Sequence, residues 1–290
     1  IICVLYVIMN SMSLNTETWE KKGTYRNGYL LNFVLGIRDS FVKAPDGYSK
    51  AAVDKIAGNF KETDSSYSQS DTKNPTIIVI MNESFADLSV VGDFETNTQV
   101  TPFMDSLSEN TLKGYALSSV YGAKTPNSEW EFETGNSMAF LPSGSIPYQQ
   151  YVLEPTASLA SLLKENGYRT LAIHPGERTS WQRNQAYPLL GFDQFKCVED
   201  MDVPLTEEHG YVSDQSSFNQ IIYEFEHKSP EERLFLFNVT IQNHGSYTVG
   251  NYPAEVTLTD EPGKYPMAEQ YLTLANKSDE AFQLLVDYFI

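Results

Sequence analysis

The order of apolar and polar positions along the chain predicts alternating strands and helices. Four short runs rich in β-branched and aromatic residues predict strands at positions 76–81, 112–121, 168–173 and 234–239. Helical patterns between turn residues predict helices at positions 51–60, 102–109, 126–138, 158–165, 214–227 and 268–289. The run TIIVIM at 76–81 is apolar throughout, so we expect that strand to be buried on both faces. This alternation predicts an α/β fold, an αβα sandwich with a mainly parallel sheet.

The ends of the chain suggest more than one segment. Residues 1–12 open on an uncharged apolar run that is too short to cross a membrane, which takes about 20 residues. We interpret it as the tail of a transmembrane helix; a signal-peptide core and a buried strand are the alternatives. Residues 13–74 are predicted to form a membrane-proximal linker with short helices, and residues 75–290 the globular domain. The chain begins with Ile and stops within a helical pattern, so we expect it to be truncated at both ends, with the C-terminal part of the domain missing.

Composition narrows the possible partners. The 290 residues carry 38 Asp and Glu against 20 Lys and Arg, a formal net charge of −18. Such an acidic surface argues against nucleic acid as a partner, because binding there depends on neutralising phosphates with basic side chains. A site for an anionic substrate would then need a local cation such as a metal ion. Two cysteines cannot form a disulfide framework or a cysteine-based zinc site.

Candidate chemistry follows three of the predicted strands. Glu83 comes just after the first, His174 directly after the third, and His244 shortly after the fourth. Ligands of open α/β sheets bind beyond the carboxyl ends of the strands, so these side chains are predicted to meet at one edge. A single histidine at a strand end is more often structural. The convergence of a carboxylate with two of the four histidines in the chain favours a functional site.

Two further segments contain candidate site residues, and each segment also has a purely structural interpretation. Thr125 precedes Pro126 where a helix is expected to begin, so it is either a simple helix cap or a hydroxyl placed where the helix favours a phosphate. A threonine needs activation before it acts as a nucleophile. The loop that follows His174 carries Trp181 and Arg183. Arg183 is suited to hold phosphate oxygens, and Trp181 to cover a glycerol or acyl group; the alternative is an exposed loop with a packed tryptophan.

Four motifs together resemble one known family. They are NPTIIVIMNESFADL at 74–88, GAKTPNSEWEFETG at 122–135, HPGERTSWQRNQAYPLLGFDQF at 174–195 and TIQNH at 240–244. Their order and context are similar to those of the lipoteichoic acid synthase family, which are sulfatase-like phosphoglycerol transferases of the alkaline phosphatase superfamily. The similarity runs over residues 74–290 and makes residues 75–290 a sulfatase-like catalytic domain. It implies a protein of the cell membrane whose catalytic domain lies on the extracytoplasmic face.

The resemblance also implies roles for single residues. Glu83 matches a metal ligand, and Thr125 matches the nucleophile, which also contacts the metal and becomes phosphoglycerylated. Four residues match the glycerophosphate pocket: His174, Trp181, Arg183 and His244. The implied cofactor is one divalent metal, typically Mn²⁺, with Mg²⁺ or Zn²⁺ as alternatives. The implied donor is phosphatidylglycerol, and the acceptor a glycerophosphate polymer or glycolipid of the lipoteichoic acid type.

One part of the family pattern is missing. The family completes its metal site with an adjacent Asp-His pair, and no Asp-His dipeptide occurs in these 290 residues. Glu83 and Thr125 alone offer too few ligands for tight binding. We therefore expect these 290 residues by themselves to bind metal weakly and to be inactive. Calorimetric titration with Mn²⁺ tests this, and micromolar or tighter affinity would contradict it.

Three alternatives to a transferase remain at this point. A phosphodiesterase would release the product to water with the same residues. A sulfatase would need a Cys or Ser in place of Thr125, so it is disfavoured. A non-catalytic envelope protein that keeps the fold is the alternative from another class.

Overall fold

The computed structural model describes residues 28–31, 33–34, 42, 44–59, 75–120, 122–142, 144–248, 250 and 252–290. The chain divides into two compact units. The first unit comprises residues 1–73, 118–131 and 136–146, and the second comprises residues 74–117, 132–135 and 147–290. The predicted end of a membrane helix at 1–12 lies outside the described residues, as does much of the predicted linker at 13–74.

The secondary structure of the described residues follows the predicted alternation. The strands are β1 (Ile77–Met81), β2 (Tyr168–Ile173), β3 (Gln194–Lys196), β4 (Glu207–Glu208), β5 (Tyr211–Val212) and β6 (Arg233–Val239). The α-helices are α3 (Lys50–Asn59), α4 (Pro102–Ser106), α5 (Thr125–Thr134), α6 (Pro147–Gln150), α7 (Leu159–Glu165), α8 (Arg183–Leu189), α9 (Asp214–His227) and α10 (Pro266–Phe289). Short 3₁₀ helices are η1 (Leu88–Val91), η2 (Met138–Phe140), η3 (Ser180–Gln182) and η4 (Val198–Asp200).

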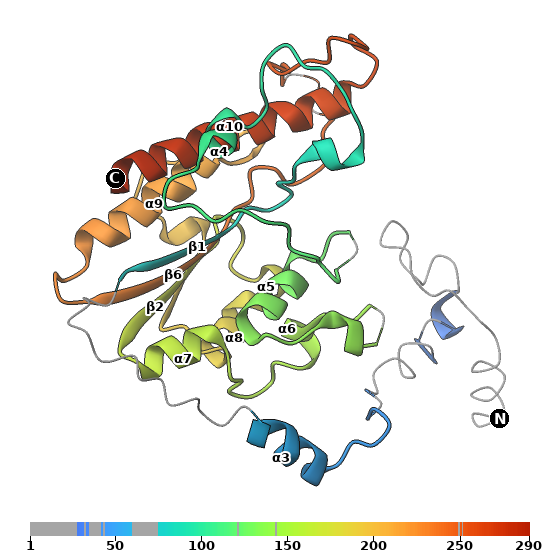
Figure 1. The fold of residues 1–290 in the computed structure, drawn as a ribbon, viewed down its shortest axis with the longest axis vertical. Helices are drawn as coiled ribbons and strands as arrows, with labels where there is room; N and C mark the ends of the chain where they lie inside the picture. Colours follow the sequence, from blue (N-terminus) through green and yellow to red (C-terminus); the bar gives the residue numbers. More distant parts are fainter. Residues whose placement is uncertain are drawn as a thin grey trace. The chain divides into compact units, whose positions relative to one another are not determined.

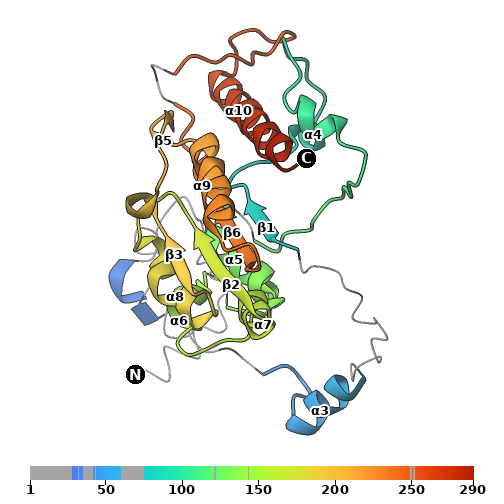
Figure 2. The ribbon, with the colours of Figure 1, turned by 90° about the vertical axis from the view of Figure 1, so that its left-hand side faces the viewer.

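A parallel sheet with the strand order β1-β6-β2-β3 forms the centre of the second unit (Figures 1 and 2). Ile77 pairs with Phe235 at the start of β1, and Tyr168 pairs with Arg233 at the start of β2. All three strand pairs run parallel, so their carboxyl ends lie at one edge. The predicted α/β fold with a parallel sheet is confirmed, and β4 and β5 pair separately as a small antiparallel ribbon.

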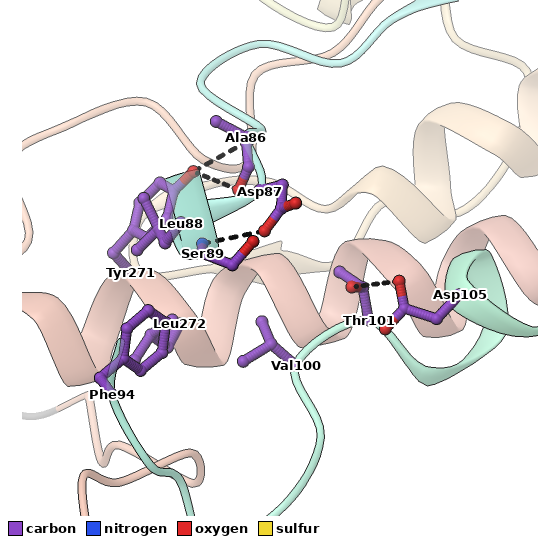
Figure 3. Close-up of a pocket in the computed structure, with 10 residues that line it drawn as sticks. All are labelled: Ala86, Asp87, Leu88, Ser89, Phe94, Val100, Thr101, Asp105, Tyr271 and Leu272. Carbon is purple, nitrogen blue, oxygen red and sulfur yellow. Dashed lines mark hydrogen bonds between the residues drawn. The ribbon is translucent and has the colours of Figure 1, made fainter. Parts of the chain in front are cut away.

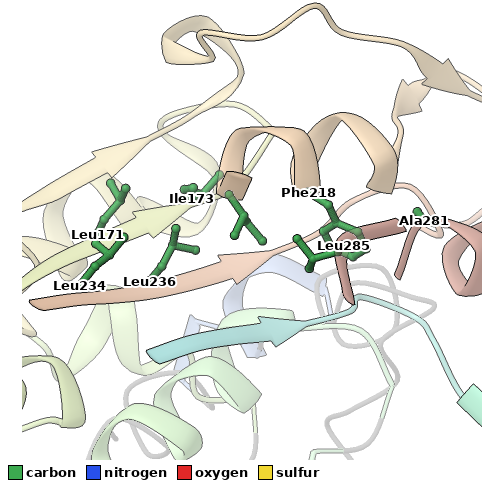
Figure 4. Close-up of a cluster of buried hydrophobic side chains, with 8 residues drawn as sticks. Leu171, Ile173, Phe218, Leu234, Leu236, Ala281 and Leu285 are labelled. Atoms are coloured by element: carbon green, nitrogen blue, oxygen red, sulfur yellow. The ribbon is translucent and has the colours of Figure 1, made fainter. Parts of the chain in front are cut away.

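Alternation along β6 explains how both faces of the sheet are covered. Leu234 and Leu236 lie in a buried cluster with Phe218 of α9 and Leu285 of α10 (Figure 4). Phe235 and Phe237, at the alternate positions, both stack on Phe192, and Phe237 also stacks on Phe132 with the ring centroids 5.7 Å apart. Burial of each such side chain contributes about 1.5–3 kcal/mol. β6 is therefore covered on both faces, as a central strand of an α/β sheet requires.

Local sequence signals set the ends of the predicted helices. The Ser158 hydroxyl accepts from the N–H of Ser161, and the Ser161 hydroxyl accepts from the N–H of Ser158, so a capping box begins α7. Gly167 follows α7 with φ of 84°, a conformation that favours glycine at a helix end. None of the helices in the described part of the chain is both long and apolar enough to cross a membrane.

Three local predictions differ from the structure. The predicted strand at 112–121 is wrong, because residues 112–120 form no strand and the side chains of Leu112 and Leu117 are fully exposed. Local hydrogen bonds between Ser118 and Val120 replace strand pairing there. β1 is only partly buried, since it lies at an edge of the sheet among the described strands. The helices predicted at 102–109 and 126–138 end early, at positions 106 and 134.

Candidate functional site at the carboxyl edge of the sheet

Three predicted site residues follow three neighbouring strands of the second unit. Glu83 comes two residues after β1, His244 five residues after β6, and His174 directly after β2. Because β6 lies between β1 and β2 and all three run parallel, the segments leave the sheet at one edge. The topology agrees with the arrangement expected from the sequence.

Glu83 and His244 approach each other at this edge. Their nearest atoms, Glu83 Oε1 and His244 Nε2, are 4.0 Å apart. The Glu83 side chain is 12% exposed and that of His244 is 50% exposed, so the carboxylate is the more buried of the two. The backbone N–H of Glu83 donates to the Thr240 hydroxyl at 3.0 Å, which fixes the chain after β1 to the chain after β6.

His174 is held in a defined orientation. The ring is buried, and its Nδ1 lies 2.9 Å from the carbonyl oxygen of Val239, the last residue of β6. A carbonyl oxygen only accepts, so Nδ1 carries the proton, and in the neutral ring Nε2 is the acceptor nitrogen. The ring also packs closely on Gly176, where a Cβ atom would come within 2.5 Å of Nε2. Gly176 is therefore required for this position of His174.

Trp181 and Arg183 lie at the junction of η3 and α8. Trp181 has φ of 57° and is partly exposed, whereas Arg183 begins α8 and is only 1% exposed. The Arg183 guanidinium is thus a buried charge near the predicted pocket segment, with Nη1 3.5 Å from the Ser180 carbonyl oxygen. The roles of both side chains in holding a phosphate stay predictions.

Thr125 belongs to the first unit and begins α5 itself. Asn127, in the same turn, donates its side-chain N–H to the Ser145 carbonyl at 3.0 Å and its backbone N–H to Lys124 at 2.9 Å. Orphan N–H groups at the start of an α-helix favour an anion. Since Glu83 lies in the second unit, the predicted partnership of Thr125 with Glu83 stays a prediction.

Left-handed backbone conformations gather next to the predicted site residues. Seven non-glycine residues in the described part of the chain have positive φ, and five of them are at or beside site positions: Ser84, Ala123, Lys124, Trp181 and Gln182. Each such conformation costs about 1–3 kcal/mol, and such residues cluster at functional sites. These conformations could not be expected from the sequence, because none of the residues is glycine.

A polar network behind Glu83 was also missed in the sequence. It consists of Asn82, Asp214, Thr240, Asn243 and Ser278, and we call it the polar network. Thr240 donates to Asn82 at 2.9 Å, Asn243 donates to Ser278 at 2.9 Å, and Ser278 donates to Asp214 at 2.6 Å. The network thus joins the ends of β1 and β6 to α9 and α10.

Asp214 is the ionisable member of the polar network. Its side chain is fully buried, and that burial raises the pKa of its carboxyl from the ordinary 3.8 to about 6. In the sequence it follows a serine cap at a helix start, where an acidic residue is common and predicts only favourable interaction with the helix dipole. Its long-range contact with α10 therefore gave no local signal.

His244 is also in contact with an aromatic ring, that of Tyr211. Five side chains, which we call the aromatic cluster, form a chain of ring contacts: His209, Tyr211, His244, Tyr247 and Tyr252. The ring centroids of Tyr211 and His244 are 5.2 Å apart, as are those of His209 and Tyr211. Four of the five are half-buried and His244 is exposed. The cluster combines β4–β5 ribbon residues with the segment after β6.

A small pocket lies near the chain that follows Glu83 (Figure 3). Its volume is about 230 Å³, and its lining includes large apolar side chains together with two carboxylates: Leu88, Phe94, Val100 and Leu272, with Asp87 and Asp105. Tyr271 of α10 borders it and receives a hydrogen bond from the N–H of Ala86 at 3.0 Å. The ring of Tyr271 also contacts Tyr247, so it separates this pocket from the aromatic cluster.

The metal site implied by the resemblance is not complete in the described residues. No three side chains of His, Cys, Asp or Glu come together there as metal ligands would. Glu83 and His244 offer one carboxylate and one imidazole, whereas divalent metals take four to eight ligands. These residues do not by themselves fit a tightly held divalent metal.

Comparisons with known proteins identify the relationship. Residues 75–289 match the sulfatase family. The chain is 34% identical over 277 residues to the "Putative cyclic beta-1,2-glucan modification protein" of Rhizobium meliloti, covering 93% of this chain and 41% of that protein. It is 27% identical over 222 residues to the lipoteichoic acid synthase of Staphylococcus saprophyticus, covering 74% of this chain and 33% of that protein. The chain therefore spans less than half the length of these two relatives.

A solved structure shows the same fold. The Streptococcus pyogenes phosphoglycerol transferase GacH, in complex with sn-glycerol-1-phosphate, matches with a TM-score of 0.69 at 21% identity. The match covers 86% of this chain and 66% of that one. The predicted alkaline phosphatase-like α/β fold is confirmed. The resemblance to lipoteichoic acid synthases is confirmed at the level of the wider family, and identity to the glucan modification protein is higher.

Proposed function

We propose that this chain, which belongs to the sulfatase family, is part of an enzyme that transfers glycerol phosphate. The donor is phosphatidylglycerol, and the acceptor is a hydroxyl group of a cell-envelope polymer. The reaction takes place on the extracytoplasmic face of the cell membrane, where both the lipid headgroup and the polymer are accessible.

The observation that supports this proposal most is that the segments carrying Glu83, His174 and His244 leave the sheet at one edge. Three neighbouring parallel strands lead to them, and Glu83 and His244 approach to 4.0 Å. A carboxylate next to an imidazole suits phosphoryl transfer, which depends on positioning and electrostatic stabilisation more than on covalent chemistry of the protein.

In the proposed reaction Thr125 is the nucleophile. Its Oγ attacks the phosphorus of phosphatidylglycerol, and the bond from phosphorus to the diacylglycerol oxygen breaks. The hydroxyl of Thr125 loses a proton and the diacylglycerol oxygen gains one, so a phosphoglyceryl-threonine and free diacylglycerol result. An acceptor hydroxyl then attacks the same phosphorus, restores Thr125 and takes the glycerol phosphate.

The remaining site residues have supporting roles. Arg183 holds the phosphate together with His174, whose Nε2 donates to it in the imidazolium form, in which both ring nitrogens carry a proton. Trp181 covers the glycerol, and His244 donates the proton to the leaving oxygen. We propose Glu83 as one ligand of a divalent metal, Mn²⁺ before Mg²⁺ or Zn²⁺, with Thr125 as a second contact. The described residues do not complete that metal site, so no step above depends on it.

The acceptor is the least determined part of the proposal. The resemblance implies a glycerophosphate polymer or a glycolipid, as in lipoteichoic acid synthesis. One relative is named for modification of a cyclic β-1,2-glucan, which supports a carbohydrate hydroxyl instead.

The covalent intermediate provides the test. Cells expressing the gene are supplied with phosphatidylglycerol labelled in its headgroup glycerol, and the peptide containing Thr125 is examined by mass spectrometry. We expect label and a phosphoglyceryl mass shift on that peptide, lost in Thr125→Ala together with at least about 10³-fold of the turnover. Thr111→Ala is the matched control, because that hydroxyl bonds locally to the Glu109 carbonyl.

Label on another residue would overturn the assignment of Thr125. Label released only as free glycerol phosphate, with acceptor in excess, would show a hydrolase.

A further inference from the structure

We propose that the aromatic cluster binds a neutral sugar ring of the acceptor, which makes it the acceptor subsite of the proposed transferase. The inference rests on the proposed function and adds to it the chemical class of the acceptor. It starts from the position of His244, which belongs to the aromatic cluster and also lies 4.0 Å from Glu83. A ligand on the cluster would therefore border the predicted reaction site.

The rings of the aromatic cluster are fixed by their polar atoms. The Tyr252 hydroxyl donates to Glu208 at 2.8 Å, and the Tyr247 hydroxyl donates to the Asn243 carbonyl at 2.8 Å. His209 Nε2 lies 2.7 Å from the Gln242 carbonyl oxygen and donates to it. Side chains held in this way lose little conformational entropy when a ligand packs on their faces, which favours binding.

The side chains of the aromatic cluster are of the kinds that bind sugars. The apolar C–H faces of a pyranose pack on aromatic rings, while its hydroxyls seek hydrogen-bond acceptors at the edges. The cluster supplies both kinds of group, since Tyr211 and His244 offer rings and Glu208 a carboxylate next to Tyr252. Sites for small ligands typically combine such an apolar surface with a few placed polar groups.

Charge distinguishes a neutral sugar from a glycerophosphate polymer. Carboxylates act on two of these rings. Glu208 accepts a hydrogen bond from Tyr252. Burial is the first cause of the raised pKa values of Tyr247 and Tyr252, and the negative charges of Glu83 and Glu255 respectively raise them further. Lys277 offsets Glu255, with which it forms an ion pair of 3.2 Å. A polyanion brought to this surface would meet repulsion, whereas a neutral glycan would not.

Direct binding tests the inference without the donor reaction. The 290-residue chain is titrated by calorimetry with a neutral β-1,2-linked glucan oligosaccharide and, separately, with a glycerol phosphate oligomer. We expect the glucan to bind and the glycerol phosphate oligomer not to compete with it. NMR spectra of the glucan should show upfield ring-current shifts of its C–H protons.

Variants of Tyr211 test whether the glucan binds on the aromatic cluster. Tyr211→Ala should raise the Kd for the glucan at least about tenfold. Tyr211→Phe should keep the Kd within about threefold, because its hydroxyl makes only a 3.4 Å contact with the Gly245 carbonyl. Tyr211→Leu keeps apolar volume without a π face and should resemble Ala. The matched control is Tyr223→Ala on α9, whose ring stacks on His227. Thermal unfolding of each variant verifies folding.

The possible outcomes separate this inference from the proposed function. Binding of the glycerol phosphate oligomer that Tyr211→Ala abolishes would overturn the choice of a neutral sugar. Glucan binding that is absent, or unchanged in a folded Tyr211→Ala, would overturn the subsite itself. A labelled Thr125 together with either result leaves the proposed function in place, and glucan binding without a labelled Thr125 would reject the proposed function alone.

Discussion

The polar network, which bonds to the Glu83 backbone, and the aromatic cluster, which contains His244, differ in the partners of their polar atoms. In the polar network, each hydroxyl or amide bonds to another buried side chain, as Ser278 does with Asp214 and Asn243. In the aromatic cluster, polar atoms bond mostly to backbone carbonyls and leave partly exposed rings. Gln242 joins the two, because its side chain donates to Ser278 while its carbonyl accepts from His209.

We expect the two groups to have different roles, the polar network in stabilising the fold and the aromatic cluster in binding a ligand. Buried hydrogen bonds connect four elements of the second unit and hold the chain after β1 and β6 in place, so their loss should lower the free energy of unfolding. Half-exposed rings contribute less to folding and more to what the surface binds. The following changes test that separation, in order of the expected change in the free energy of unfolding.

Ser278→Ala should have the largest effect on folding. Ser278 accepts hydrogen bonds from Gln242 and Asn243 and donates one to Asp214, so alanine leaves three buried groups without this partner. We expect the free energy of unfolding to fall by about 4 kcal/mol in urea denaturation. The control Ser229→Ala, at an exposed position, should change it by less than about 0.5 kcal/mol. An equal and small change in both variants would show that the polar network does not stabilise the fold.

The pH dependence of stability should report on Asp214. Its pKa is about 6 in the folded protein and near 3.8 when unfolded, so the folded state binds more protons between these values. The free energy of unfolding should therefore fall as pH rises from about 4 to 6, by up to about 3 kcal/mol. Asp214→Asn cannot ionise and should remove the part of this slope that Asp214 causes. Burial also raises the pKa of the Asp279 carboxyl, so the part that Asp279 causes should remain. Several other carboxyls have lowered pKa values, among them Asp200 and Asp202, and their stabilisation is lost only as pH falls below about 4.

A slope that persists unchanged in Asp214→Asn would contradict the assignment to this carboxyl. The comparison is made as the difference between the two proteins at each pH, so that groups common to both cancel.

Gly176→Ala should have a smaller effect on stability and a specific effect on His174. The added Cβ would lie 2.5 Å from His174 Nε2 and 3.1 Å from Ile241 Cδ1, so the ring must move. We expect a loss of about 2 kcal/mol, and ¹⁵N chemical shifts of His174 that no longer report a proton held on Nδ1. Gly114→Ala is the control, since no atom lies within 4 Å of its Cβ position. Unchanged His174 shifts in Gly176→Ala would refute the close packing.

The sequence predicted well what depends on neighbouring residues. β2 and α9 have the predicted bounds, because the apolar run of β2 and the serine before α9 are local signals. The predicted strand at 112–121 failed, since a strand depends on a partner that sequence does not reveal. Among site residues, Glu83 and His244 were predicted to meet and do so. Asp214 and Ser278 are 64 positions apart, so only the folded chain shows their hydrogen bond.

His244→Ala should change the free energy of unfolding least, by less than about 0.5 kcal/mol. Its side chain is 50% exposed, its Nδ1 bonds to the adjacent Gly245 carbonyl, and the 4.0 Å separation from Glu83 is too long for a hydrogen bond. If His244 donates the proton to the leaving oxygen, diacylglycerol release should nevertheless fall about 10²-fold in cells expressing the variant. His227→Ala, a change at another exposed histidine, should leave both quantities unchanged. A large loss of stability without loss of turnover would show that His244 stabilises the fold, as the polar network does, and takes no part in the reaction. The division into a stabilising polar network and a binding aromatic cluster would then be wrong at His244.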